Sequence, residues 1–192
     1  MDFKDYQKYK WFITNSGKLV IGGKSAEQNE ALLKKITSLK KEKIIMHTEE
    51  PGSPFAIILT DKKHSPSDLE ETAIFTASFS RAWRSGKKKA VVDIFSSKQI
   101  FKTSSMKIGT WGVKSIIKRI SVPLALVLTK QKGKLRAIPE ISINPKDAVL
   151  LKISPGKIDK TKMLPQIQAL LPKISKEEIL SALPSGGIKV VK

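Results

Sequence analysis

Cysteine is absent from the 192 residues of this chain, which excludes disulfide bonds, cysteine nucleophiles and thiolate zinc sites. Histidine occurs only as His47 and His64, so we expect no metal centre built from imidazoles, and no cofactor is expected either. Uncharged runs reach only about ten residues, whereas a membrane-spanning helix needs about 20. The N-terminal segment carries acids and lacks the apolar stretch of a signal peptide. We therefore expect a cytoplasmic protein with no membrane partner.

Acidic residues are scarce in the middle of the chain. The net charge is +19, from 36 Lys and Arg against 17 Asp and Glu. Residues 1–80 hold 12 basic and 11 acidic residues and residues 137–192 hold 9 and 5, but residues 81–136 hold 15 basic residues and one acid, Asp93. Charge that is not cancelled locally favours a polyanionic partner whose association weakens steeply with salt. A basic surface that serves only solubility is the alternative.

The order of apolar runs and capping signals predicts an α+β fold. Strands are expected at residues 11–14, 18–21, 43–47, 55–60, 90–95, 100–103, 122–129, 135–138 and 149–154. Capping boxes at Ser25–Gln28 and Ser67–Glu70 predict two longer helices, the second running to Gly86. Because strands outnumber helices and do not alternate with them, we expect a mixed, mainly antiparallel sheet with these two helices packed on it.

The C-terminal part of the chain is expected to be a small helical extension. Helical segments are predicted at residues 162–171, which contain Pro165, and from a capping box at Ser175–Glu178 to Leu183. The charge density falls near residues 139–145. We therefore predict an α+β domain over residues 1–138, followed by a strand and helices over residues 139–192 that pack on the same core.

Gly22 and Gly23 stand between a predicted strand and a predicted helix, followed by Lys24 and Ser25. A nucleotide-binding P-loop would need another glycine at position 18, which is a lysine, so this motif is rejected. Two interpretations remain. The backbone amides and Lys24 could hold a phosphate, or the glycines could be required sterically by a tight turn.

Five cations cluster at the end of the second predicted helix: Arg81, Arg84 and Lys87–Lys89. Cations favour the C-terminal end of a helix dipole, but five exceed what this effect needs. Arg81 and Arg84 share a helix face and could span a phosphate backbone. Trp83 lies off that face, and we expect it in the core because an indole buries a large apolar area.

Residues 107–119 interleave cations with two glycines and an indole. Trp111, between Thr110 and Gly112, could stack on an unpaired base or could pack inward on a bent strand. His47 and Glu49 form another candidate pair, because residues i and i+2 of a strand face the same way. They could serve acid–base chemistry or a metal, but no third ligand is near, so a hydrogen bond or RNA contact from His47 is favoured.

These segments, taken in order, resemble the R domain of NFACT proteins. The opening match comprises Lys10-Trp11-Phe12, Gly17 and the run from Leu19 to Glu30. Later matches are His47-Thr48-Glu49 with Gly52, Leu69-Glu70-Glu71 with Ala73, Ser80 to Ser85, Gln99 to Lys102, Gly109-Thr110-Trp111 and the glycine-containing residues 154–156 and 183–187. The last of these are similar to the tail of archaeal members, and the chain looks like a standalone R domain.

The resemblance implies an RNA-binding module of the ribosome quality-control factors that recruit tRNA to stalled large subunits. We therefore expect a non-enzymatic protein that binds tRNA or large-subunit rRNA, with an RNA-processing enzyme using His47 and Glu49, or a DNA-binding protein, as alternatives. The predicted contacts are Lys24, His47, Arg81, Arg84, Lys87, Lys88, Lys89, Lys102, Lys107, Trp111, Lys114, Lys118 and Arg119, with backbone contacts from Gly22 and Gly23.

Overall fold

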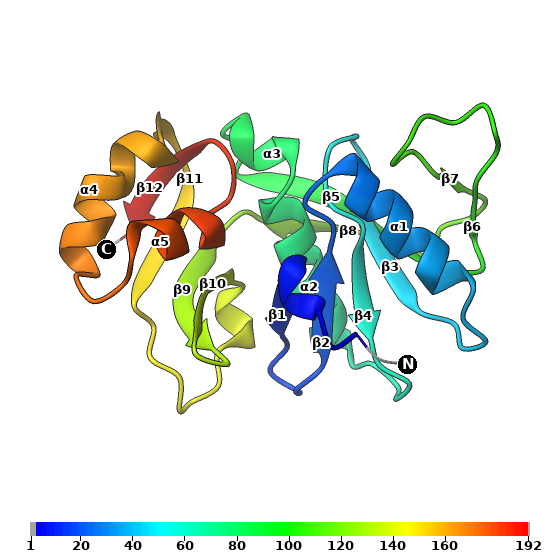
Figure 1. Cartoon of the computed structure of the whole chain (residues 1–192), viewed down its shortest axis with the longest axis horizontal. Helices are drawn as coiled ribbons and strands as arrows, with labels where there is room; N and C mark the ends of the chain where they lie inside the picture. The colour runs from blue at the N-terminus through cyan, green and yellow to red at the C-terminus, as the bar shows by residue number, and fades with distance from the viewer. Residues whose placement is uncertain (1–2, 192) are drawn as a thin grey trace.

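A computed structural model describes residues 3–191 and contains a six-stranded antiparallel sheet in the centre (Figure 1). A short 3-10 helix, Tyr6–Lys8, leads into its first strand. The strands, in spatial order, are β1 (Lys10–Ile13), β2 (Leu19–Gly22), β4 (Ala56–Leu59), β3 (Ile44–Thr48), β5 (Lys89–Ser96) and β8 (Lys118–Pro123). All five neighbouring pairs are antiparallel, which confirms the predicted α+β class.

Helices cover both faces of the sheet at β1–β4, which explains why these strands are apolar without alternation. Successive strand residues point to opposite faces. Trp11 therefore packs in the cluster that α1 (Ala26–Thr37) covers, whereas Phe12 packs with Phe75 of α2 (Pro66–Ser78) on the other face. The two predicted helices thus enclose the sheet from opposite sides.

A second antiparallel sheet of four strands lies beside the first, on the left in Figure 1. Its order is β10 (Lys134–Ile138), β9 (Leu126–Gln131), β11 (Leu151–Asp159) and β12 (Gly187–Val191), and a 3-10 turn, Glu140–Ser142, follows β10. The helices α4 (Lys160–Leu170) and α5 (Lys176–Ala182) pack against it. The boundary predicted between residues 138 and 139 falls within this sheet, and the division into domains stays a prediction.

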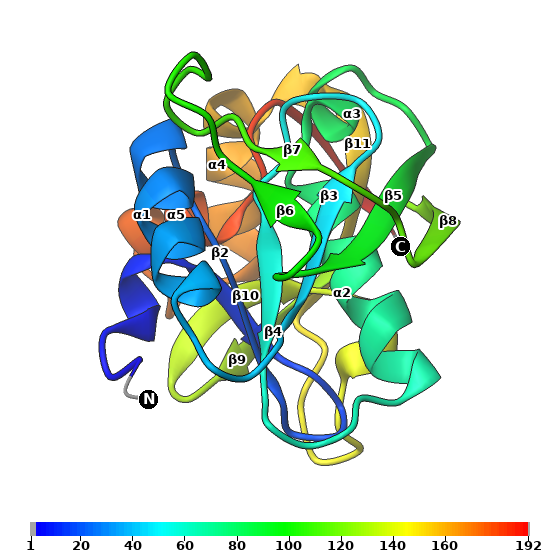
Figure 2. The same cartoon turned by 90° about the vertical axis from the view of Figure 1, so that its right-hand side faces the viewer.

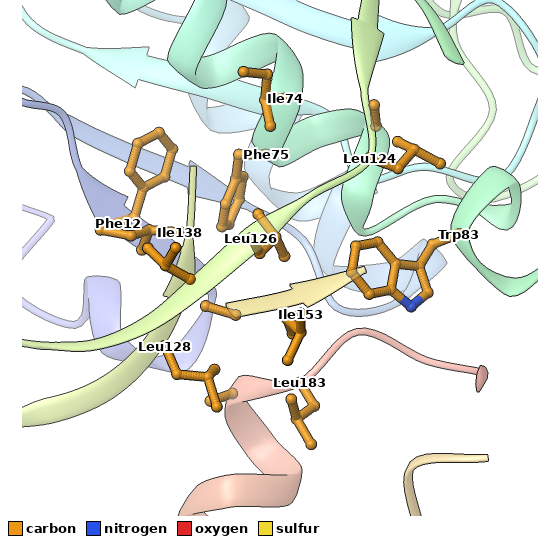
Figure 3. Packing of buried hydrophobic residues seen from close by; sticks show 14 of the residues in the cluster. Phe12, Ile74, Phe75, Trp83, Leu124, Leu126, Leu128, Ile138, Ile153 and Leu183 are labelled. Carbon is orange, nitrogen blue, oxygen red and sulfur yellow. The ribbon is translucent and has the colours of Figure 1, made fainter. Parts of the chain in front are cut away.

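The two sheets meet along β1 and β10, which are edge strands of their own sheets. The Gln131 side chain bridges this seam: its Nε2 donates to the Ile13 carbonyl and its Oε1 accepts from the Ile13 amide, both at 2.8 Å. The amide of Gln131 thus occupies backbone groups that an edge strand would otherwise leave unpaired. Behind the seam, Phe12, Leu128 and Ile153 belong to one apolar cluster, so both sheets share a core (Figure 3).

The second predicted helix differs from the structure at both ends. It begins two residues earlier, because Ser65 rather than Ser67 is the N-cap: Ser65 Oγ accepts from the Asp68 amide and Asp68 Oδ2 accepts from the Ser65 amide. It ends at Ser78, because Ser80 caps a separate one-turn helix, α3 (Arg81–Arg84). The predicted single helix to Gly86 is therefore wrong.

Two strand predictions are also corrected. Residues 122–129 are not one strand, since β8 ends at Pro123, which lacks an amide donor, and β9 begins at Leu126 in the other sheet. The strand expected to end before Pro155 continues to Asp159 through a bulge over residues 155–158. There β11 lies so close to its antiparallel neighbour β12 that a Cβ on Gly156 would lie 2.4 Å from the Ile188 backbone. The strand β12 itself was not predicted.

The chain between β5 and β8 forms a small ribbon of its own. The strands β6 (Ile100–Phe101) and β7 (Gly112–Val113) pair with each other, so the predicted strand over 100–103 is shortened. The loop between them rises beside the start of α1 (Figure 2), where a Cβ on Gly109 would lie 2.8 Å from Ala26. None of the helices within residues 3–191 is long and apolar enough to cross a membrane.

Candidate nucleic-acid interface

A groove of about 660 Å³ lies at one end of the central sheet, and the segments that form its walls run along the upper edge in Figure 1. Its walls are the β2–α1 turn, the β3–β4 loop, α3 and the β6–β7 loop. Polar groups from four separate segments therefore converge on one surface. The predicted site residues that line it are Gly23, Lys24, His47, Arg81, Arg84 and Trp111.

Arg81 and Arg84 are exposed on α3, and neither forms an ion pair within residues 3–191. The Arg81 amide donates to the Gly52 carbonyl at 3.0 Å, which ties α3 to the β3–β4 loop. Gly52 has φ of 108°, and a Cβ there would lie 2.6 Å from Arg81 Cγ, so only glycine leaves room for the arginine stem. Trp83 is fully buried, as expected, and its Nε1 donates to the Gly187 carbonyl at 3.0 Å.

The β6–β7 loop is held against α1 by Glu30. Its Oε2 accepts from Lys102 Nζ at 2.9 Å, from the Gly109 amide at 3.0 Å and from Trp111 Nε1 at 3.1 Å. The hydrogen bond from Lys102 is the largest cause that lowers the pKa of Glu30 to about 2. Trp111 is half-buried with its nitrogen engaged, and the neighbouring Ile108, which sequence reasoning missed, is 64% exposed in the groove.

Other predicted cations are already paired with acids from the N-terminal part of the chain. Lys87 Nζ lies 2.7 and 2.8 Å from the two carboxylate oxygens of Glu50. Lys102 lies over the Trp111 ring at 5.9 Å from its centroid and forms the ion pair with Glu30. The exposed pair of Lys87 and Glu50 exchanges readily, and Lys87 can contact a phosphate only by leaving Glu50.

The remaining predicted lysines are exposed but lie outside the groove. Lys89 lines a smaller hollow between the β3–β4 loop and α3, and Lys88 precedes it. Lys107 lies in the β6–β7 loop and Lys114 follows β7. Lys118 lines a hollow at the opposite end of the sheet. The structure therefore divides the predicted contacts into a convergent set and a scattered set.

The two glycines before α1 have steric explanations. Gly22 is buried in β2, and a Cβ on Gly23 would lie 2.3 Å from Asn29 Oδ1. The Lys24 amide donates to Gln28 Oε1 at 3.0 Å and is thus occupied. These contacts favour the tight-turn interpretation, while the Lys24 side chain is exposed in the groove. Phosphate contact by the glycine backbones stays a prediction.

His47 and Glu49 are each engaged with another group. His47 Nδ1 lies 2.7 Å from the Thr48 carbonyl and donates to it, and burial lowers the pKa of His47, so the ring is neutral at pH 7. Glu49 Oε1 lies 2.7 Å from Arg119 Nη1, and Arg119 Nε lies 2.6 Å from Asp93 Oδ1. Arg119 is therefore bound by two carboxylates. Within residues 3–191, no group of three or more metal-ligating acids and histidines occurs.

Lys10 is a groove residue that was not predicted as a contact. It begins β1, and its ammonium lies 4.3 Å from the centroid of the Phe79 ring. Burial, followed by repulsion from Lys160, Lys24 and Arg136, lowers the pKa of Lys10 to about 8. The sequence signal that could have predicted this contact is a lysine directly before Trp11-Phe12, at the start of an apolar strand.

The fold and the groove together define an α+β binding domain whose site suits an anionic partner. A family model described as the NFACT protein RNA binding domain matches residues 8–115, which include every predicted residue in the groove. The chain belongs to this family of RNA-binding domains, as the resemblance implied.

Curated and solved relatives agree with this assignment. The archaeal Rqc2 homolog aRqcH of Methanocaldococcus jannaschii is 32% identical over 203 residues, covering 98% of this chain and 30% of that protein. The ribosome quality control complex subunit NEMF homolog of Drosophila melanogaster is 35% identical over 80 residues, covering 41% of this chain and 8% of that protein. The C-terminal part of the fibronectin/fibrinogen-binding protein from Streptococcus suis shares the fold, with a TM-score of 0.54 at 23% identity, over 61% of this chain and 45% of that chain.

Proposed function

We propose that this protein binds RNA through the groove without catalysing a reaction, and that tRNA or large-subunit rRNA in the cytoplasm is its partner. The observation that carries the proposal is the convergence of Lys24, Arg81 and Arg84, which form no ion pairs among the described residues, in a member of a family of RNA-binding domains. The names of the archaeal and fly relatives refer to ribosome quality control, which supports a partner on or near the large ribosomal subunit.

The groove offers two kinds of contact to an RNA strand. Arg81 and Arg84 can form charge-assisted hydrogen bonds to backbone phosphates, and the guanidinium fork suits this geometry. Trp111 has its nitrogen fixed by Glu30, so its exposed part is oriented for stacking on an unpaired base. An RNA contact from His47, whose ring interacts with the backbone of Thr48 and Ser53, stays a prediction.

Charge reversal on α3 tests the proposal. The double substitution Arg81→Glu and Arg84→Glu removes two phosphate contacts. Each such contact contributes about 1.5–3 kcal/mol, so affinity for tRNA should fall by at least about a hundredfold. The slope of log K against log salt should become shallower by about 2. Lys62→Glu with Lys63→Glu is the matched control, because both lysines are exposed near the opposite end of the sheet.

Binding should be measured by fluorescence anisotropy with labelled tRNA and large-subunit rRNA fragments at several salt concentrations. Equal losses in the α3 variant and in the Lys62/Lys63 control would mean that the interaction is only a diffuse charge effect. Absence of binding to either RNA at low salt would contradict the proposal.

Two alternative functions predict different results with the same purified protein and RNA. RNA turnover that is abolished by His47→Ala would indicate an RNA-processing enzyme, although His47 and Glu49 are each engaged elsewhere. Competition between RNA and DNA of the same length separates an RNA-binding from a DNA-binding protein, since only RNA offers the 2′-hydroxyl.

A further inference from the structure

Lys10 lies at the end of the groove where the two sheets meet, and positive groups surround it. Its ammonium lies 4.3 Å from the centroid of the Phe79 ring, and it pairs with no carboxylate in the part of the chain that the structure describes. Lys160, Lys24 and Arg136 all act on it as repelling charges. With a pKa of about 8, Lys10 is still mainly protonated at pH 7, so these charges coexist.

Arg136 reaches the seam from β10, which lies beside β1. Its guanidinium carbon lies 4.9 Å from the centroid of the Trp11 ring, and its buried Nε has no hydrogen-bond partner within residues 3–191. Glu178 is the one charge that counteracts the effect of burial on the pKa of Arg136, and its Oε1 also accepts from the Leu135 amide at 2.7 Å. A buried guanidinium with an unsatisfied donor is unusual, because buried charges are ordinarily paired.

Lys24 and Lys160 complete the set from two further segments. Lys24 projects from the β2–α1 turn, and no side-chain hydrogen bond occupies its ammonium among the described residues. Lys160 begins α4, where its Nζ donates to the Leu180 carbonyl at 3.0 Å. Asp159 beside it raises the pKa of Lys160, although burial lowers it more. Both ammonium groups therefore retain donors that can turn towards a ligand.

The geometry points to an oxyanion site at the seam of the two sheets, in which Lys10, Lys24, Arg136 and Lys160 together bind a phosphate group. Like charges at close quarters in a half-buried place repel strongly, and a bound anion converts this repulsion into attraction. Phosphate oxygens suit both the guanidinium fork and the ammonium donors. Because the cations outnumber the nearby acids, the site favours a dianionic phosphate monoester over a singly charged phosphodiester.

This site shares Lys24 with the contacts of the proposed function, and its other three cations are distinct from them. Arg81 and Arg84 lie on α3 within the region of the family match, whereas Arg136 and Lys160 lie beyond residue 115. The phosphate could be the terminal phosphate of a bound RNA or free phosphate. The inference rests on the proposed function only if the phosphate is the terminal phosphate of a bound RNA.

Titration with inorganic phosphate tests the site itself. Calorimetry should be done on the full chain at pH 7 and constant ionic strength, with chloride as the replaced anion. Lys10→Met keeps the stem of the side chain but removes its charge, and should raise the Kd for phosphate at least about tenfold. Lys24→Gln should act in the same direction, and it is an exposed position where the fold tolerates change. Lys63→Met, at an exposed position away from the seam, should leave the Kd unchanged.

The inference is overturned if inorganic phosphate does not bind, or if Lys10→Met and Lys24→Gln bind it as tightly as Lys63→Met does. If Lys10→Met does not fold, the Kd of Lys24→Gln for inorganic phosphate, compared with that of Lys63→Met, decides the test.

Two RNA oligonucleotides of one sequence, with a 5′-phosphate or a 5′-hydroxyl, then identify the source of the phosphate. Tighter binding of the phosphorylated strand, lost in Lys10→Met, assigns the site to an RNA end. Equal binding of both strands, with inorganic phosphate still bound through Lys10, assigns it to free phosphate. Arg81→Glu should weaken both oligonucleotides without changing the Kd for inorganic phosphate, so failure of the proposed function and failure of this site are distinguishable.

Discussion

Replacing Glu30 with glutamine should release the β6–β7 loop from α1. The carboxylate is only 11% exposed and accepts from Lys102 Nζ, the Gly109 amide and Trp111 Nε1 at 2.9–3.1 Å. Glutamine preserves the shape of the side chain but removes its charge and turns one acceptor into a donor. Three loop groups therefore lose their shared charged acceptor, while the core residues of α1 are untouched.

The hydrogen bonds and the pKa of Glu30 give similar estimates of the free energy of unfolding that Glu30→Gln loses. A hydrogen bond to a charged group contributes about 1.5–3 kcal/mol against about 1 kcal/mol for a neutral one, so losing the charge on a three-fold acceptor should cost about 2–3 kcal/mol. The pKa of Glu30, lowered from 4.5 to about 2 chiefly by the hydrogen bond from Lys102, corresponds to about 3 kcal/mol of stability. Because this pKa is lowered, the stability is present above pH 4.5 and disappears as the pH falls towards 2.

Urea unfolding at pH 7 and pH 3 checks both estimates. Glu30→Gln should lose about 2–3 kcal/mol at pH 7, and the gap to the unsubstituted protein should shrink to about half at pH 3. Glu70→Gln is the control, since Glu70 is exposed on α2 and should change the free energy of unfolding by less than about 0.5 kcal/mol. A gap at pH 7 no larger than that of the control, or one that does not depend on pH, would refute the reasoning.

Glu30→Gln also shows whether Glu30 affects RNA binding through its negative charge or by holding Trp111 in the groove. Removing a negative charge should strengthen binding to a polyanion if the net field alone matters. If Glu30 acts by holding Trp111 in the groove, affinity should instead fall several-fold despite the gain in net charge. Anisotropy titrations of Glu30→Gln and Glu70→Gln with the same labelled tRNA compare the two, and a stronger binding of Glu30→Gln would exclude the positioning role.

Two further substitutions probe how the site is supported. Gln131→Leu removes both hydrogen bonds to Ile13 at the seam and should lower the free energy of unfolding by about 2 kcal/mol, measured by urea unfolding; a change below about 0.5 kcal/mol would mean that water replaces the amide. Gly52→Ala places a Cβ 2.6 Å from Arg81 Cγ at a φ of 108°, so it should cost about 1–3 kcal/mol and weaken RNA binding as loss of Arg81 does. Unchanged RNA affinity in a folded Gly52→Ala would show that Arg81 does not depend on this contact.

The local elements of the fold were largely predictable because their signals are local. The N-cap at Ser25 and the strand around Trp11 and Phe12 depend on residues that are close in sequence. The errors occur where tertiary structure decides. Residues 122–129 have one continuous apolar pattern, and nothing local indicates that its two halves join different sheets. Likewise, the glycines of β11 and β12 are explained by the close approach of the two paired backbones at the bulge, and only the folded chain brings these backbones together.

The separation of Arg81 and Arg84 from α2 has a similar origin. Periodicity extends through residues 67–86, so one helix was predicted. The break requires the hydroxyl of Ser80, which accepts from the Ala82 amide and donates to the Ala77 carbonyl. A serine inside a helical pattern is equally compatible with a continuous helix, and the choice depends on Trp83, which must reach the core and Gly187.

The distribution of charge along the chain predicted the region of the site but not which of its cations are free. Residues 81–136 contain one acid, yet folding brings three acids from the N-terminal part onto their cations: Glu30 pairs with Lys102, Glu50 with Lys87, and Glu49 with Arg119. These partners are 72, 37 and 70 positions apart, far beyond any local pattern.

The converse holds for Lys10, which lies in the nearly neutral first part of the chain. Folding surrounds it with Lys24, Arg136 and Lys160 and leaves it without an acid among the described residues. The net charge of a segment therefore predicts neither the paired cations of residues 81–136 nor the unpaired Lys10. Whether a cation is neutralised depends on which segments the fold brings together. Among the described residues, cations without an ion pair line the α3 side of the groove and the seam between the two sheets. An anionic ligand that follows this charge would contact both sheets at once, and its binding should couple their stabilities.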